Sequence, residues 1–90
     1  MRELTIEELE SIFPAECHFK VIAMNLIGIH KRLNEVLMEL GINDCAFQPG
    51  IQSRNGKYMS YDISIQVESH LREREIDHAL RAVQGVKMVM

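Results

Sequence analysis

Residues 58–67 alternate without a break between polar and apolar side chains, and this run restricts the possible folds more than any other feature of the chain. Alternation with a period of two predicts a β-strand with one face on a core and the other away from it. The strand follows Asn55-Gly56, a dipeptide typical of tight hairpin turns because both residues tolerate a positive φ. An antiparallel partner strand is therefore expected over residues 45–53. Pro49 cannot donate a backbone hydrogen bond, so this partner is predicted at a sheet edge.

The alternation also assigns side chains to the two faces of the sheet. In the 45–53 strand, Phe47 and Ile51 are expected on one side and Gln48 and Gln52 on the other. The core-facing set of the 58–67 strand is Met59, Tyr61, Ile63, Ile65 and Val67. On the opposite, open face, the residues that we take as a candidate binding surface are Lys20, Gln48, Gln52, Tyr58 and Ser60.

The rest of the chain supplies two more strands and two long helices. Residues 16–24 alternate as a strand, and an apolar stripe at helical spacing follows from a cap at Asn25 to Gly41. Ser69 begins a second such helix, which Gly85 ends, and residues 86–90 form the last strand. The order β-α-β-β-α-β predicts an α+β, ferredoxin-like sandwich. Its four-stranded antiparallel sheet has the order 4-1-3-2, with both helices on one face.

An acidic segment precedes this unit. Thr5 can cap a short helix with Glu8 as its partner three residues on, and Pro14 ends it. We therefore divide the chain into a helical extension, residues 1–13, and a ferredoxin-fold domain, residues 14–90. Ile6 and Leu9 are expected to dock this extra helix.

Composition limits both compartment and partner. Residues 1–16 carry a net charge of −4, whereas residues 17–90 are nearly neutral, so the chain lacks the basic surface of a general nucleic-acid binder. No apolar run is long enough to span a membrane. The N-terminus lacks the basic and apolar segments of a signal peptide, so we expect a cytoplasmic protein with Cys17 and Cys45 as free thiols.

Four segments resemble the YbeD-like family of small bacterial proteins, a domain of unknown function. They are Phe13-Pro14, Phe19-Lys20-Val21, the hairpin from Ser53 to Ser60, and the C-terminal Val86-Lys87-Met88-Val89-Met90. Members of that family look like the ACT domain, a ferredoxin-like module that senses amino acids in metabolic enzymes. The resemblance implies a regulatory or binding module that acts through a small ligand or a protein partner, with self-association as one form of partnership.

A second similarity concerns ACT domains directly. Asn25-Leu26-Ile27-Gly28-Ile29 is similar to the segment that joins their first strand to their first helix, and Leu40-Gly41-Ile42-Asn43 resembles the entry to their second strand. Free N–H groups at the start of a helix attract anions, and a glycine there permits close approach. The hypothesis is a ligand site at Asn25, Leu26, Ile27 and Gly28, and its alternative is that Gly28 only packs the turn.

Catalytic and metal chemistry find little support in the sequence. The four histidines, His18, His30, His70 and His78, lack metal-ligand spacing, and adjacent Cys17 and His18 point to opposite faces of a strand. No serine or cysteine stands in a recognisable nucleophile motif. We therefore expect a protein that is not an enzyme and that needs neither metal nor cofactor.

The alternative function is RNA binding, because RNA-recognition motifs share this topology. Tyr58 would stack on bases, and Lys20, Lys57 and Lys87 would contact phosphates. Tyr61 has the opposite parity to Tyr58, so one aromatic residue of this strand faces the open side, whereas base stacking uses two or three. The sequence therefore argues against a nucleic-acid partner.

Overall fold

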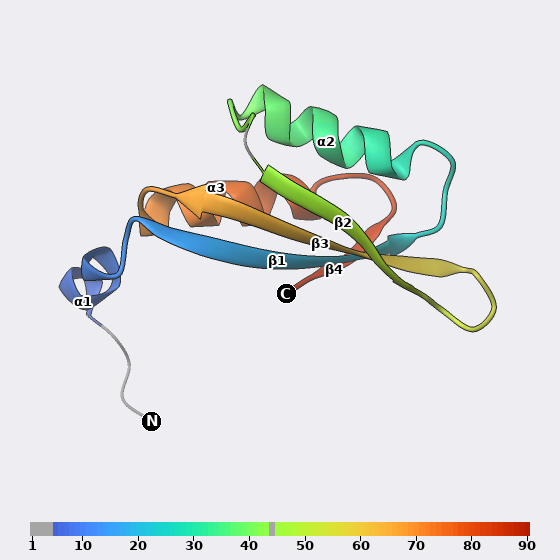
Figure 1. Ribbon diagram of the computed structural model, residues 1–90, viewed down its shortest axis with the longest axis horizontal. Helices are drawn as coiled ribbons and strands as arrows, with labels where there is room; N and C mark the ends of the chain where they lie inside the picture. The colour runs from blue at the N-terminus through green and yellow to red at the C-terminus, as the bar shows by residue number, and fades with distance from the viewer. Residues whose placement is uncertain (1–4, 44) are drawn as a thin grey trace.

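The computed structural model describes residues 5–43 and 45–90. A four-stranded sheet carries two long helices on one side, and a short helix stands apart at the N-terminal end (Figure 1). The elements in chain order are α1 (Ile6–Ser11), β1 (Ala15–Met24), α2 (Ile29–Glu39), β2 (Cys45–Gln52), β3 (Tyr58–Val67), α3 (His70–Arg81) and β4 (Val86–Val89).

The strands are hydrogen-bonded in the order β2-β3-β1-β4, and every pair is antiparallel. Read from the β4 edge, this order is 4-1-3-2. The two central strands pair over their full length, from Ala15 opposite Val67 to Met24 opposite Tyr58. Pro49 lies on the edge strand β2, where the lack of a backbone N–H does not interrupt the hydrogen bonds between the central strands.

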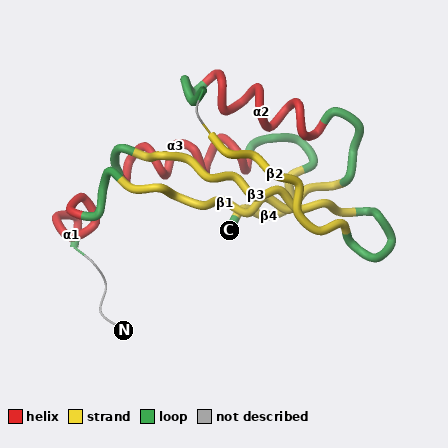
Figure 2. The backbone as a smooth tube through the Cα atoms, viewed as in Figure 1, coloured by secondary structure: helices red, strands yellow, loops and turns green. Residues whose placement is uncertain are grey.

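One side of this sheet and the two long helices enclose the core. The core-facing residues of β3 are as expected, because Tyr61, Ile63, Ile65 and Val67 are buried and Met59 packs against them. The helices contribute Leu33 and Leu37 from α2 and Ile76 and Leu80 from α3. The opposite side of the sheet, which we call the open face, carries neither α2 nor α3 (Figure 2).

The predicted cap at Asn25 is wrong. Helix α2 begins at Ile29, and its cap position is Gly28, whose φ of 85° is left-handed. The Asn25 side chain is engaged elsewhere, since its amide donates to the Gly56 carbonyl at 3.0 Å and its backbone N–H donates to Lys57. Asn25 therefore ties the β1–α2 turn to the β2–β3 hairpin instead of beginning a helix.

Two expectations for β2 are also wrong. The pairing of β2 with β3 shifts between Pro49 and Gln52, so the alternation of faces is interrupted there. Gln52 pairs with core-facing Met59 and so leaves the open face, while Ile51 leaves the side of Phe47 and reaches the open face beside Ser60. A proline followed by a glycine favours such a bulge, because neither residue supports regular pairing.

The N-terminal helix, expected within residues 1–13, is six residues long, from Ile6 to Ser11. Thr5 caps it as expected, since its hydroxyl accepts from the Glu8 N–H at 3.1 Å. The docking expected of Ile6 and Leu9 concerns side chains outside the described part of the structure. Among the residues that the structure does describe, no helix combines the length and apolar character needed to cross a membrane.

Candidate functional site

The open face carries a group of exposed apolar side chains that we call the apolar patch. Ile51 is 78% exposed, Met90 58% and Met88 47%, whereas Ile22 and Tyr58 are half-buried. Strand pairing brings these side chains together. Met88 lies opposite Ile22 of β1, and the backbone of Met90 is hydrogen-bonded to that of Lys20, which is also on β1. Single exposed apolar side chains are ordinary, but a contiguous group of them indicates a binding surface, so the patch is a candidate for one.

A shallow hollow of about 300 Å³ lies within this patch, on the side formed by β1, β2 and β3. Ile22, Ile51 and Tyr58 line it together with the Lys20 side chain. Asp62 of β3 lies between Lys20 of β1 and Gln48 of β2, so a row of polar groups borders the apolar ones. An apolar centre with a polar border is the usual composition of a protein-binding surface.

The bulge in β2 aims Ile51 into this hollow. Ser60, expected to be exposed, is 7% exposed because its hydroxyl is enclosed by the bulge. The Ser60 Oγ accepts from the Ile51 N–H at 2.8 Å and donates to the Ile51 carbonyl at 3.2 Å. Gly50 leaves room for this contact, since a Cβ atom there would lie 2.4 Å from the Ser60 Oγ. Ser60 is therefore a buried support for the patch, and not a contact residue.

Tyr58 is less available than the sequence suggested. The Nζ atom of Lys57 lies 5.4 Å from the centre of the Tyr58 ring, within range of a cation–π contact. The ring is also half-buried in the hollow. Both features reduce the ring surface that a nucleic-acid base would need for stacking.

The turn between β1 and α2, expected to hold a ligand, is open but shallow. Leu26, Ile27 and Gly28 share a hollow of about 360 Å³ with Arg32, and Asn25 is turned away toward the hairpin. Ile27 is fully exposed. A Cβ atom on Gly28 would meet nothing within 4 Å, so this glycine is required by its positive φ and not by close packing. Three of the four expected residues therefore lie together.

The structure brings together three polar side chains that sequence reasoning missed. On the open face, His18 Nδ1 lies 2.8 Å from the Ser64 Oγ, and His18 Nε2 lies 3.7 Å from the Glu16 carboxylate. The residue types are those of a serine–histidine–carboxylate relay, but the two ring nitrogens have the opposite partners from that arrangement. The side chains of His18 and Glu16 are 73% and 59% exposed, however, so water competes for each contact. The sequence could have indicated this cluster, because residues 16 and 18 share one face of their strand and residue 64 lies on the same face of the strand that pairs with it.

The two cysteines are free and half-buried. Both lie opposite Ile65 on the strands that flank β3, which places their Cα atoms about 10 Å apart, beyond the ~7 Å reach of a disulfide. The Cys17 thiol donates to the Glu73 carboxylate at 3.2 Å. Burial and this carboxylate raise the pKa of Cys17 to about 11, so the thiol is protonated and unreactive at neutral pH.

Metal-ligating side chains do not gather into a site in the part of the chain that the structure describes. Histidine, cysteine, aspartate and glutamate form no group of three or more there that would hold an ion.

Comparisons with known proteins place the chain among small bacterial proteins. The profile of DUF493, a family described as proteins of unknown function, matches residues 8–90. A UPF0250 protein of Pseudomonas putida (strain W619) is 34% identical over the whole of both chains. A UPF0250 protein of Pseudomonas entomophila (strain L48) is 32% identical, again over both full chains.

Two solved structures share the fold. A solution structure of protein HP0495 from Helicobacter pylori superposes with a TM-score of 0.76 at 20% sequence identity, covering 88% of this chain and 84% of that one. A second solution structure of HP0495 gives a TM-score of 0.63 at 20% identity, with 87% of each chain covered. At this identity the likeness concerns the arrangement of helices and strands.

Proposed function

Because this chain belongs to the DUF493 family of proteins of unknown function, its role must be argued from its own surface, and we propose that it is a non-catalytic, protein-binding module. The binding surface is the open face of the sheet. In an ACT-like arrangement such a module would regulate by bringing its partner to, or keeping it from, another protein.

The apolar patch is the observation that carries this proposal. Ile51, Met88 and Met90 are each about half exposed or more, on strands from both edges of one sheet. Burying such side chains against a partner is favourable by about 25 cal/mol per Å² of apolar surface removed from water. The β2 bulge, which turns Ile51 outward, adds to the patch a side chain that regular pairing would have hidden.

Two observations weigh against the RNA-binding alternative. Lys57 covers the ring of Tyr58, and the Tyr61 ring is buried in the core. A sheet that binds single-stranded nucleic acid ordinarily presents two or three exposed aromatic rings, on which successive bases stack.

The small-ligand hypothesis keeps one supporting observation. The hollow at Leu26, Ile27 and Gly28 includes Arg32 at the start of a helix, so a small carboxylate there would compete for the guanidinium with Glu35 and Glu39, which lie 3.6 and 3.4 Å from it. A thermal-shift screen of amino acids and small carboxylates tests it, with a ligand at 100 times its dissociation constant expected to stabilise by about 2.7 kcal/mol. A stabilising compound should lose its effect in Arg32→Ala, and a screen without such a compound would leave the open face as the binding surface.

Site-specific crosslinking in living cells tests the protein-binding proposal. A photoreactive amino acid replaces Ile51 in one strain and Leu71 in another, since Leu71 is a comparably exposed apolar residue on α3, on the far side of the sheet. Irradiation should give a protein adduct from position 51 and none from position 71. Adducts from position 71 alone, or from neither position, would contradict the proposal.

A further inference from the structure

We propose that the partner on the open face is a second copy of this chain, packed face to face with its strands antiparallel to those of the first. This inference rests on the proposed binding function of that face. The two-fold axis would run across the sheet along one row of side chains, which we call the central row. Its members are Ile51, Ser60, Ile22 and Met88, one from each strand.

The pairing pattern defines the central row. Ile22 of β1 lies opposite Ser60 of β3 and opposite Met88 of β4, while Ile51 of β2 is hydrogen-bonded to Ser60. A two-fold axis along this row places each of these residues on its own equivalent in the other copy. Ile51 then packs on Ile51 and Met88 on Met88, so one patch is complementary to itself, as a symmetric interface requires.

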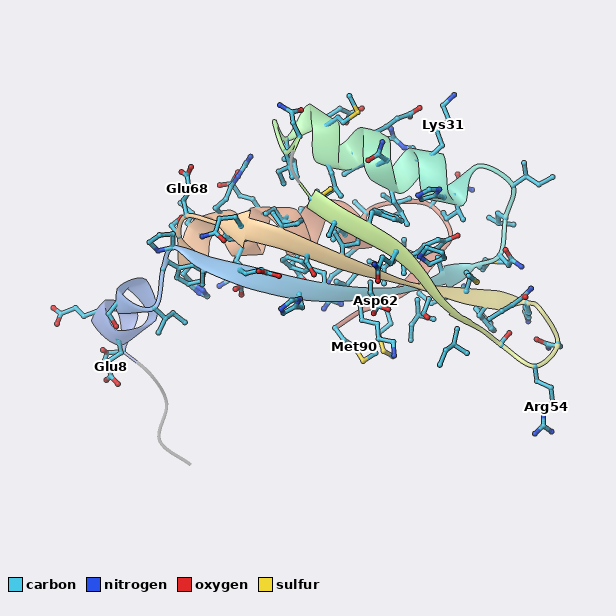
Figure 3. The ribbon with its side chains drawn as sticks, in the orientation of Figure 1. Glu8, Lys31, Arg54, Asp62, Glu68 and Met90 are labelled. Carbon is cyan, nitrogen blue, oxygen red and sulfur yellow. The ribbon has the colours of Figure 1, made fainter. Side chains whose placement is uncertain are left out.

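Charge selects the antiparallel arrangement. Figure 3 shows Arg54, at the tip of the β2–β3 hairpin, projecting from the same side of the sheet as Asp62 and Met90, whereas Lys31 and Glu68 project from the helix side. Glu16 occupies the opposite end of the open face, near the start of β1. The positive and negative ends of this face are therefore separated along the strands.

These two charges lie on opposite sides of the axis. Arg54 follows Ile51 by three residues and Glu16 precedes Ile22 by six, which corresponds to about 10 Å and about 20 Å along the strands. Antiparallel packing therefore places the hairpin end of one copy, with Arg54, over the end of the other copy that carries Glu16. Parallel packing would place the two hairpin ends together, so opposite charges favour the antiparallel arrangement.

The area is sufficient for a modest dimer. The strands β1, β2, β3 and β4 contain 10, 8, 10 and 4 residues. At about 3.3 Å per residue and about 4.8 Å between strands, their open face covers about 500 Å² per copy. Two copies would bury about 1,000 Å², the lower limit for a specific association, so a concentration-dependent dimer is expected.

Sedimentation equilibrium on the purified full chain tests the dimer, over about 1 µM to 1 mM, the range in which weak complexes dissociate. Ile51→Asp should raise the dissociation constant at least tenfold, because it places a carboxylate on its own equivalent across the axis. Leu71→Asp, on α3, should leave the constant unchanged. Circular dichroism establishes that each variant is folded. A wild-type chain that stays monomeric throughout, or a dimer that Ile51→Asp leaves intact, would overturn the proposal.

Charge exchange tests the register. Arg54→Glu and Glu16→Arg should each weaken the dimer several-fold at low salt, and the double variant should recover the wild-type constant. Absence of recovery would overturn the antiparallel arrangement. The crosslinking experiment separates this inference from the proposed function: an adduct between two copies at position 51 supports both, whereas an adduct with a different protein supports the function and contradicts the dimer.

Discussion

At the scale of single residues, the position of Ile51 depends on two small neighbours. A Cβ atom on Gly50 would lie 2.4 Å from the Ser60 Oγ, which binds the Ile51 backbone. Gly50→Ala should turn this hydroxyl away, leave the Ile51 N–H without its acceptor, and lower the free energy of unfolding by about 1–3 kcal/mol. Urea unfolding measures the change.

Ser60→Ala is the matched comparison, because it removes the same hydroxyl without adding a methyl group at Gly50. If the hydroxyl carries the effect, the double variant should be only slightly less stable than either single variant. Strictly additive losses would show that the two residues act separately.

The Cys17 thiol makes a second prediction at this scale. Burial, with the Glu73 carboxylate as the smaller cause, raises its pKa from an ordinary value of 9.0 to about 11. Between these two values the unfolded chain releases the thiol proton while the folded protein retains it. The folded state therefore binds more protons, and stability falls as pH rises through this window.

Urea unfolding at several pH values between 8 and 11 checks this dependence. Burial also raises the pKa of Tyr61, which contributes a loss in the same direction above pH 10. The informative quantity is thus the difference between the wild type and Cys17→Ala, which should have the smaller loss. Equal slopes in the two proteins would contradict the role of Cys17.

At the scale of elements, regular segments were predictable and their interruptions were not. The alternation of 58–67 correctly assigned the core face of β3, because period and burial agree along an unbroken strand. The same reasoning failed in β2, where a shift of one position after Pro49 exchanges the faces of Ile51 and Gln52. Pro49-Gly50 favours an interruption at this point, but the register that follows it is set by Ser60 on the neighbouring strand.

The start of α2 shows the same limit. Asn25 is a favourable cap residue, but its amide is used by the hairpin at Gly56, which lies 31 positions along the chain. Local preference was therefore overridden by a tertiary contact, and the cap moved to Gly28. Lys20, Gln48 and Tyr58 lie on the open face as expected, while the exposure of Ile51, Met88 and Met90 beside them was recognised only from the structure.

The α1 element should be dispensable for folding. It is six residues long, too short to be stable alone, and it precedes the strand–helix unit. Deleting residues 1–12 keeps Phe13, which packs against the core, and should leave a cooperative thermal transition by circular dichroism. A chain that lost cooperative unfolding would show that this segment completes the core.

At the scale of the whole molecule, the long axis of the protein and the line that joins the charged ends of its open face run in the same direction. The principal extents are 43, 32 and 19 Å, and the radius of gyration of 14.1 Å exceeds the ~12 Å expected of a compact chain of this length. Helix α1 lies at one end of the long axis and the β2–β3 hairpin at the other (Figure 1). Arg54 and Glu16 lie toward opposite ends of this axis, so an antiparallel dimer would be more evenly charged at its two ends than either copy.

Amide hydrogen exchange distinguishes this arrangement from association through sheet edges. The central strands β1 and β3 pair on both sides and should exchange slowest, whereas β2 and β4 each pair on one side. Face-to-face packing covers side chains and leaves the outward N–H groups of both edge strands in water. Raising the protein concentration through the dimerisation range should therefore leave exchange at those edge amides unchanged. Edge-to-edge association would instead add a ladder of hydrogen bonds at β2 or β4 and slow exchange there. Pro49 and the bulge oppose such a ladder on β2, so a slowing confined to β4 would be the clearest result against the face-to-face dimer.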